Sequence, residues 1–197
     1  MKNAQFLIVV ILAVLVSACA GTNFKRPDPQ ALIVGKSNSS DVVNVMGAPG
    51  QTGELLKNNE KVRILRYAYA EGAGTGRYPG VTPARAMVFY TVNDVLVGLE
   101  FVSSFADDAT DFDESKLSAI TKGKSTRADV VALLGQPIGN VVYPLVKNKG
   151  ETGIVYAYSH VKGTVFNMTQ YSKTLIVSFD ANHVATEVEY VSTGEKS

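Results

Sequence analysis

The sequence has few of the residues from which reactive or metal-binding sites are built. Among 197 residues there is one cysteine, Cys19, and there are two histidines, His160 and His183. A single cysteine excludes an intramolecular disulfide and a cysteine-based metal cluster. Neither histidine has a cysteine, histidine or carboxylate neighbour at metal-ligand spacing. We therefore expect no metal ion and no cofactor, and we interpret both histidines as uncommitted side chains.

Catalytic motifs are missing as well. No serine lies in a Gly-x-Ser-x-Gly elbow. Glu100 and Glu189 recur at equivalent positions, but they belong to separate halves of the chain and are interpreted as outward-facing strand residues. The two Gly-Lys-Ser triplets lack the earlier glycine of a phosphate-binding loop, because Gln30 and Ser118 occupy its position. The sequence thus predicts a protein that is not an enzyme and that has no small-molecule substrate.

A charge excess of either sign is absent too. Without Lys2, which lies in the signal described next, 18 basic residues balance 18 acidic ones. Domains that bind nucleic acid normally carry a basic patch, so this balance argues against a nucleic-acid partner.

The N-terminus is typical of a secretory signal. The apolar run at 6–16 has eleven residues, whereas about twenty are needed to cross a bilayer. The Val-Ser-Ala-Cys stretch that ends at Cys19 resembles the lipobox of bacterial lipoproteins, in which the cysteine is acylated, with palmitate for example, and becomes the N-terminus. We expect a signal peptide at 1–18, a lipid on Cys19 and a tether at 19–29. Ala20, rather than aspartate, follows the cysteine, which predicts the periplasmic face of the outer membrane.

A stretch of fifteen residues occurs twice. Residues 35–49 and 123–137 are identical at eight of fifteen positions, without a gap, at an offset of 88. In each copy a potential capping serine, Ser37 or Ser125, precedes an apolar helical face that ends at Gly-x-Pro. The duplication therefore predicts the same short amphipathic helix in both halves of the chain.

Segments rich in Val, Ile, Tyr and Phe follow each helix and predict strands, with hairpin turns at Asn93 and Asn182. We predict an α+β fold of two tandem repeats, each a helix pair packed on a three-stranded antiparallel sheet. The expected boundaries are 30–104 for repeat 1, 105–112 for an acidic linker, 113–192 for repeat 2 and 193–197 for a tail. The linker lacks the spacing of an EF-hand loop, so we interpret it as solvated chain that caps the next helix.

The order of glycine, small capping residue, Val-rich helix, Gly-x-Pro and three-stranded meander resembles the SmpA/OmlA (BamE) family of outer-membrane lipoproteins. The tandem arrangement is similar to the β-lactamase inhibitor protein fold. The first resemblance implies a non-catalytic accessory that supports or stabilises an envelope protein assembly, such as outer-membrane protein assembly or a secretion or pilus apparatus. The second implies an alternative, a binding inhibitor or modulator of a periplasmic enzyme.

The two copies differ most between their first and second predicted strands, at 71–85 and 159–173. Connections of this length in compact domains are often functional, and Arg, Tyr, Phe and Met are enriched at protein interfaces. The residues expected to contact a partner are Arg77, Tyr78, Arg85, Phe166, Met168 and Tyr171. The other interpretation is a mobile loop in the first copy and extended strands in the second, with aromatic side chains packed on the core.

Overall fold

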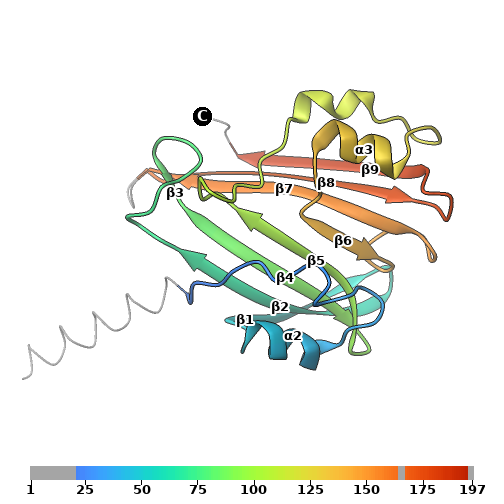
Figure 1. The fold of residues 1–197 in the computed structure, drawn as a ribbon, viewed down its shortest axis with the longest axis horizontal. Helices are drawn as coiled ribbons and strands as arrows, with labels where there is room; N and C mark the ends of the chain where they lie inside the picture. Colours follow the sequence, from blue (N-terminus) through green and yellow to red (C-terminus); the bar gives the residue numbers. More distant parts are fainter. Residues whose placement is uncertain (1–20, 164–166, 195–197) are drawn as a thin grey trace, which may run out of the picture.

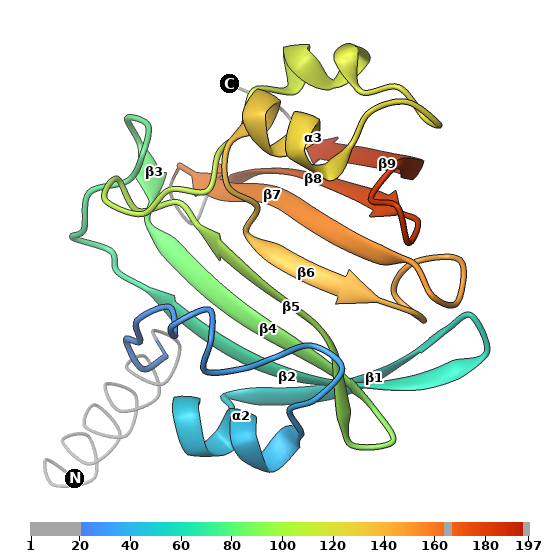
Figure 2. The same ribbon diagram turned by 45° about the vertical axis from the view of Figure 1, so that its right-hand side comes forward.

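The computed structural model describes residues 21–163 and 167–194. Nine strands of these residues form one antiparallel sheet in the order β1-β2-β4-β5-β6-β7-β8-β9, with β3 paired to β7. The sheet curls into a half barrel, and helices α2 and α3 lie on its outer, convex side at opposite ends of the strand order (Figures 1 and 2). The inner, concave side carries no helix among the described residues.

The first half of the chain contains α2 (Ser39–Met46), β1 (Gln51–Lys57), β2 (Glu60–Ala70), β3 (Val81–Thr82), β4 (Ala84–Val92) and β5 (Val95–Ser103). The second half contains the 3-10 helix η1 (Glu114–Ala119), α3 (Arg127–Leu134), β6 (Gly139–Val142), β7 (Thr152–Lys162), β8 (Thr169–Phe179) and β9 (Ala185–Gly194).

The predicted fold class is wrong. Two separate three-stranded sheets were expected, but β5 pairs with β6 and makes one continuous sheet of both halves. This pairing satisfies backbone groups that a free edge strand would leave exposed. The sequence did not reveal two strands of the first half: the two-residue β3, and β1, whose exposed QTGELLK sequence lacks apolar alternation. The first half also lacks a helix pair, because residues 29–36 form turns rather than a helix.

Both duplicated segments form the short helix expected of them. Asn38 caps α2 and Thr126 caps α3, each one residue after the serine that the sequence suggested, and an aspartate completes a capping box in both. The serine hydroxyls instead accept hydrogen bonds from N–H groups four residues earlier in the chain. The helices end at Gly47 and Gly135, whose φ angles of 79° and 85° favour glycine.

Each helix packs on an apolar core on the convex side of its half. A tyrosine from the neighbouring strand joins helix and sheet in the same way in both halves. The Tyr67 hydroxyl of β2 donates to the carbonyl oxygen of Gly47 at 2.8 Å, and the Tyr156 hydroxyl of β7 donates to that of Gly135 at 2.8 Å. The duplicated glycine therefore ends the helix and also anchors it to the sheet.

The acidic connection between the halves is bound to the protein rather than solvated throughout. Lys173 of β8 is 2% exposed, and its ammonium group lies 2.7 Å from an Asp111 carboxylate oxygen and 4.4 Å from the centre of the Phe112 ring. Asp113 accepts a hydrogen bond from the N–H of Ser115 at 3.0 Å and caps η1, so the predicted capping role is confirmed.

The described part of the predicted tether contacts both halves. Gly21 forms an isolated bridge with Tyr69 at the end of β2. The Phe24 ring meets that of Phe101 edge-on, with centroids 6.5 Å apart. Arg26 donates to the carbonyl oxygen of Ile138 at 3.2 Å. The chain is therefore held against the sheet from Gly21 onward.

Candidate functional site: the concave groove

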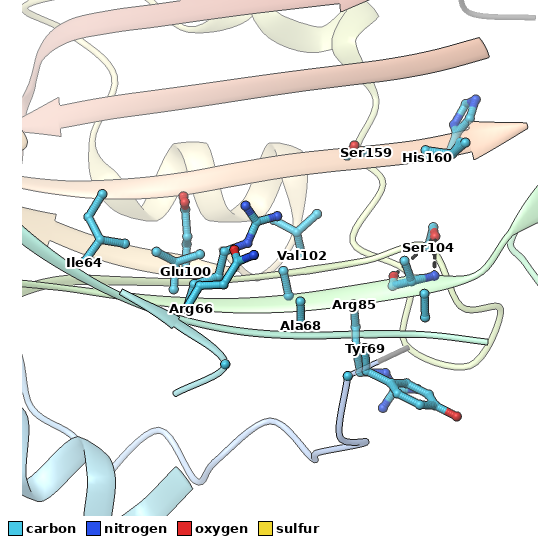
Figure 3. A pocket seen from close by; sticks show the side chains of 18 of the residues that line it. Ile64, Arg66, Ala68, Tyr69, Arg85, Glu100, Val102, Ser104, Ser159 and His160 are labelled. Carbon is cyan, nitrogen blue, oxygen red and sulfur yellow. Dashed lines mark hydrogen bonds between the residues drawn. The ribbon is translucent and has the colours of Figure 1, made fainter. Parts of the chain in front are cut away.

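A groove of about 690 Å³ lies on the concave side, mainly over the first half, and residues 159–161 of β7 and Gln170 of β8 complete its lining. Successive side chains of a strand point to opposite faces of a sheet. In β2, Leu65 and Tyr67 face the helix-covered core, whereas Ile64, Arg66 and Ala68 line the groove. Figure 3 shows Ile64, Arg66 and Ala68 on the same side of the sheet as groove-lining residues of β5.

Alanines form the floor of the groove. Ala68 and Ala70 of β2 lie directly opposite Ala86 and Ala84 of β4. Because these side chains are single methyl groups, they leave the space above two adjacent strands open. Val88 and further apolar side chains extend the floor. The result is a hollow with an apolar base, which suits side chains supplied by another molecule.

One row of polar groups crosses this floor. Arg66, Val88 and Glu100 lie side by side on β2, β4 and β5. The Tyr90 hydroxyl donates to a Glu100 carboxylate oxygen at 2.7 Å. Burial raises the pKa of the Glu100 carboxyl, against the opposing effects of the Tyr90 hydrogen bond and the Arg66 charge. Burial, followed by the charge of Glu100, also raises the pKa of Tyr90.

Arg66 is the exposed charge of this row. It forms no ion pair with any of the residues that the structure describes. The guanidinium group therefore keeps its donors available to a molecule that enters the groove, where an acceptor would bind in partly apolar surroundings.

The matching concave surface of the second half is covered by the connection between β6 and β7. Leu145 and Val146 of this connection pack with the cluster that contains Val155. A Cβ atom on Gly98 would lie 2.4 Å from a Leu145 methyl carbon, and one on Gly153 would lie 2.8 Å from a Val146 methyl carbon. These glycines make room for the covering connection.

Hydrogen bonds hold this cover in place from the first half. The side-chain amide of Asn58, in the turn between β1 and β2, donates to the carbonyl oxygens of Pro144 and Val146, both at 2.9 Å. The Tyr143 hydroxyl returns a bond to the Asn58 carbonyl oxygen at 2.9 Å. These hydrogen bonds join the β1–β2 turn of the first half to the β6–β7 connection of the second half.

Two of the residues predicted to contact a partner are engaged within the protein. Arg85 lies 4.2 Å from the centre of the Phe105 ring and 3.3 Å from an Asp108 carboxylate oxygen. Figure 3 shows its side chain on the other side of the sheet from Glu100. Tyr171 is 5% exposed and donates to Glu114 at 3.2 Å.

The other predicted contact residues lie in or beside the two long connections. Arg77 is exposed. Tyr78 is 39% exposed, and its hydroxyl donates to Asp111. Met168 is 60% exposed. Phe166 and the predicted lipidation site Cys19 lie outside the described residues.

The structure brings the two connections together. Val81 of β3 pairs with Lys162 at the end of β7, so the chain that follows Tyr78 joins the strand that leads into the second connection. The second connection is shorter than expected, because β7 continues to Lys162 and β8 begins at Thr169. Extended strands, the other interpretation of this copy, are therefore confirmed.

Sequence reasoning missed the groove residues. Glu100 was singled out only because Glu189 occupies the equivalent position, and both were expected on an outward face. The signal was the alternation of β2, in which Arg66 stands between Ile64 and Ala68 on the face that does not carry the core tyrosine. Recognising the groove also required the curl of the sheet, which no single strand encodes.

The part of the chain that the structure describes contains no cluster of three or more His, Cys, Asp or Glu side chains arranged to hold a metal ion. Among the same residues, no helix is both long and apolar enough to cross a bilayer.

No protein-family model matches the chain, and no curated protein matches it significantly. A solved structure of a candidate β-lactamase inhibitor protein from Streptococcus mutans is similar to it over 82% of this chain and 91% of that chain, with 9% sequence identity and a TM-score of 0.41. No finding supports the SmpA/OmlA (BamE) resemblance.

Proposed function

We propose that this protein is a non-catalytic, lipid-anchored accessory of the outer membrane that binds another envelope protein in its concave groove. Such a partner belongs to an assembly of the envelope, such as outer-membrane protein assembly or a secretion or pilus apparatus. The observation that carries the proposal is the open groove, with its alanine floor and the exposed Arg66, which forms no salt bridge with the described residues.

A protein segment matches the chemistry of this groove. The alanine floor accepts apolar side chains, and Arg66 offers its donors to a carboxylate or a backbone carbonyl of the segment. An arginine at the centre of an apolar contact is a frequent source of binding energy in protein interfaces.

The same concave surface favours a second candidate function, a binding inhibitor or modulator of a periplasmic enzyme. In that case the segment in the groove belongs to a soluble enzyme, and its activity falls when the complex forms. The two functions differ in the partner and not in the residues of this chain that bind it.

Photo-crosslinking in intact cells tests the proposal. A photoreactive amino acid at Ala86 in the groove should yield a specific adduct with one protein, and the Arg66→Glu variant should abolish it. The control position is Val45, which is 44% exposed on the convex side. Mass spectrometry of the adduct distinguishes a membrane assembly from a soluble enzyme. Absence of an adduct at Ala86, or the same adduct from Val45, would rule the groove out.

The lipid anchor is tested separately by membrane fractionation. The Cys19→Ser variant should leave the outer-membrane fraction and appear in the soluble periplasmic fraction. Continued sedimentation of this variant with membranes would contradict the anchor.

A further inference from the structure

The chain leaves the sheet very close to the proposed lipid. Gly21 is bridged to Tyr69 near the end of β2, and a Cβ atom on Gly21 would lie 2.0 Å from the Ala68 carbonyl oxygen, so the backbones are in close contact. Cys19 precedes Gly21 by two residues, which span at most about 7 Å when extended. With the spacing of about 5 Å between bridged residues added, the residue that would carry the acyl chains lies within roughly 12 Å of the end of β2.

Contacts extend from this point to the long connection of the first half. The Tyr69 ring stacks on that of Phe105, with centroids 5.9 Å apart and planes 3° apart. Phe105 in turn forms a bridge with Gly76, the residue before Arg77. Figure 1 shows this connection and the start of β8 at the same end of the molecule as the N-terminal residues of the described chain.

We propose that this end of the molecule faces the lipid bilayer and that Tyr78 and Met168 lie at the level of the lipid headgroups. The loop end is defined as residues 71–80 together with Gly163 and Met168. The proposal rests on the lipid anchor of the proposed function and adds to it a fixed orientation of the protein on the membrane.

The exposed side chains of the loop end suit this position. The Tyr78 ring is 39% exposed, with its hydroxyl held by Asp111, and Met168 is 60% exposed and apolar. Tyrosine is enriched at membrane–water interfaces. The loop end contains one exposed acidic residue, Glu71, and one exposed basic residue, Arg77, so its charges balance. The contact therefore depends on the short anchor and not on attraction to anionic lipids.

The orientation also limits what the groove can bind. Gly21, Ser159 and Gln170 line the groove at the loop end, so the groove extends to the membrane side of the molecule. The opposite end is distant, since β8 runs for 11 residues away from the loop end, which is roughly 35 Å. A partner in the groove therefore lies next to the bilayer, as the periplasmic part of a membrane protein does.

Fluorescence depth measurement tests the orientation. The intact lipoprotein carries Met168→Cys or, as a control at the distant end, the exposed Ala181→Cys. When Cys19 is acylated, the introduced cysteine is the only free thiol, and it is labelled with an environment-sensitive dye. The protein is then reconstituted in phosphatidylcholine vesicles that contain lipids spin-labelled at the headgroup. We expect at least several-fold stronger quenching at position 168 than at 181, with no change when phosphatidylglycerol is added.

Two outcomes separate the failure of the orientation from the failure of the anchor. If the protein does not float with the vesicles, the lipid anchor itself is wrong. If it floats but both positions are quenched equally, or 181 more strongly, the orientation is wrong. A third variant with sixteen Gly and Ser residues inserted after Ala20 should float and lose the contrast between the positions. A contrast that survives this insertion would contradict the short anchor as its cause.

Discussion

The two halves of the molecule agree on one side of the sheet and differ on the other. On the convex side both halves carry a helix with a capping box, a glycine that ends it, and a tyrosine bonded to that glycine. On the concave side the first half is open and the second is covered by Leu145 and Val146. The duplicated residues thus maintain the fold. The residues that differ between the halves determine which concave surface is open.

The two cations that hold the acidic connection, Arg85 and Lys173, are alike in arrangement but unlike in burial. Arg85 and Lys173 are 88 residues apart, as the duplicated helices are, and each holds one end of the acidic connection through an aromatic ring and an aspartate. The arrangement is shared, but the arginine is 12% exposed and the lysine 2%. The comparison therefore predicts unequal effects when the two ion pairs are broken.

The largest effect is expected at the junction of the halves. A Cβ atom on Gly139 of β6 would lie 2.3 Å from the Leu99 carbonyl oxygen of β5, so Gly139→Val must separate the two strands. We expect a loss of more than about 4 kcal/mol in the free energy of unfolding, measured by urea denaturation. Gly72→Val is the control, because a Cβ atom there meets open space. Equal stability of the two variants would contradict the junction.

The next largest effect is expected at the buried ion pair of the second half. Asp111→Asn leaves the Lys173 charge without its carboxylate, which costs about 3 kcal/mol for a buried pair. Asp108→Asn, the matching change beside Arg85, removes a carboxylate that is 32% exposed and should cost less than about 1 kcal/mol. Thermal and urea unfolding of both variants check this order. Equal losses would show that the two ion pairs are equivalent.

A smaller and equal effect is expected from the two tyrosines. Tyr67→Phe and Tyr156→Phe each remove one hydrogen bond to the glycine that ends a helix, at a cost of about 1 kcal/mol. Urea denaturation of the single and double variants measures both. If the losses in the free energy of unfolding differ by more than twofold, the two hydrogen bonds are not energetically equivalent despite their equal lengths.

The smallest effect on stability is expected at Glu100, where the substitution should stabilise the protein and not destabilise it. Burial raises the pKa of this carboxyl above its ordinary 4.5, so the folded chain holds a proton that the unfolded chain releases as the pH rises. Stability therefore falls with increasing pH through the window from 4.5 to the raised pKa. Glu100→Gln keeps an acceptor for Tyr90 and should raise the melting temperature at pH 7. Glu189→Gln, on an exposed edge, should leave it unchanged.

The sequence was most informative about helix ends and hairpin turns. Positive φ at Asn93 and at His183 confirms the two hairpin turns, and Gly47 and Gly135 end the helices as predicted. These features depend on one or two residues and their local backbone, so they can be recognised without the rest of the fold. The caps lie one residue from their predicted positions because serine, threonine and asparagine all accept the required hydrogen bond.

The sequence was least informative about contacts between the halves. The short strand β6 needs glycine at position 139, because a Cβ atom there would collide with β5. Strand β1 is too exposed to show an apolar pattern. The number of strands in the sheet was therefore mispredicted. Arg85 and Tyr171 are held by partners that spacing along the chain does not reveal, Asp108 in the connection between the halves and Glu114 in η1.

The cover over the second concave surface also determines stoichiometry. A chain built from a duplicated unit would offer two equivalent binding surfaces if both were open. Leu145 and Val146 occupy the space above Gly98 and Gly153, and the bonds to Asn58 hold them there. The proposed binding should therefore be univalent, with one partner segment per chain, and a calorimetric titration with the partner should saturate at one to one.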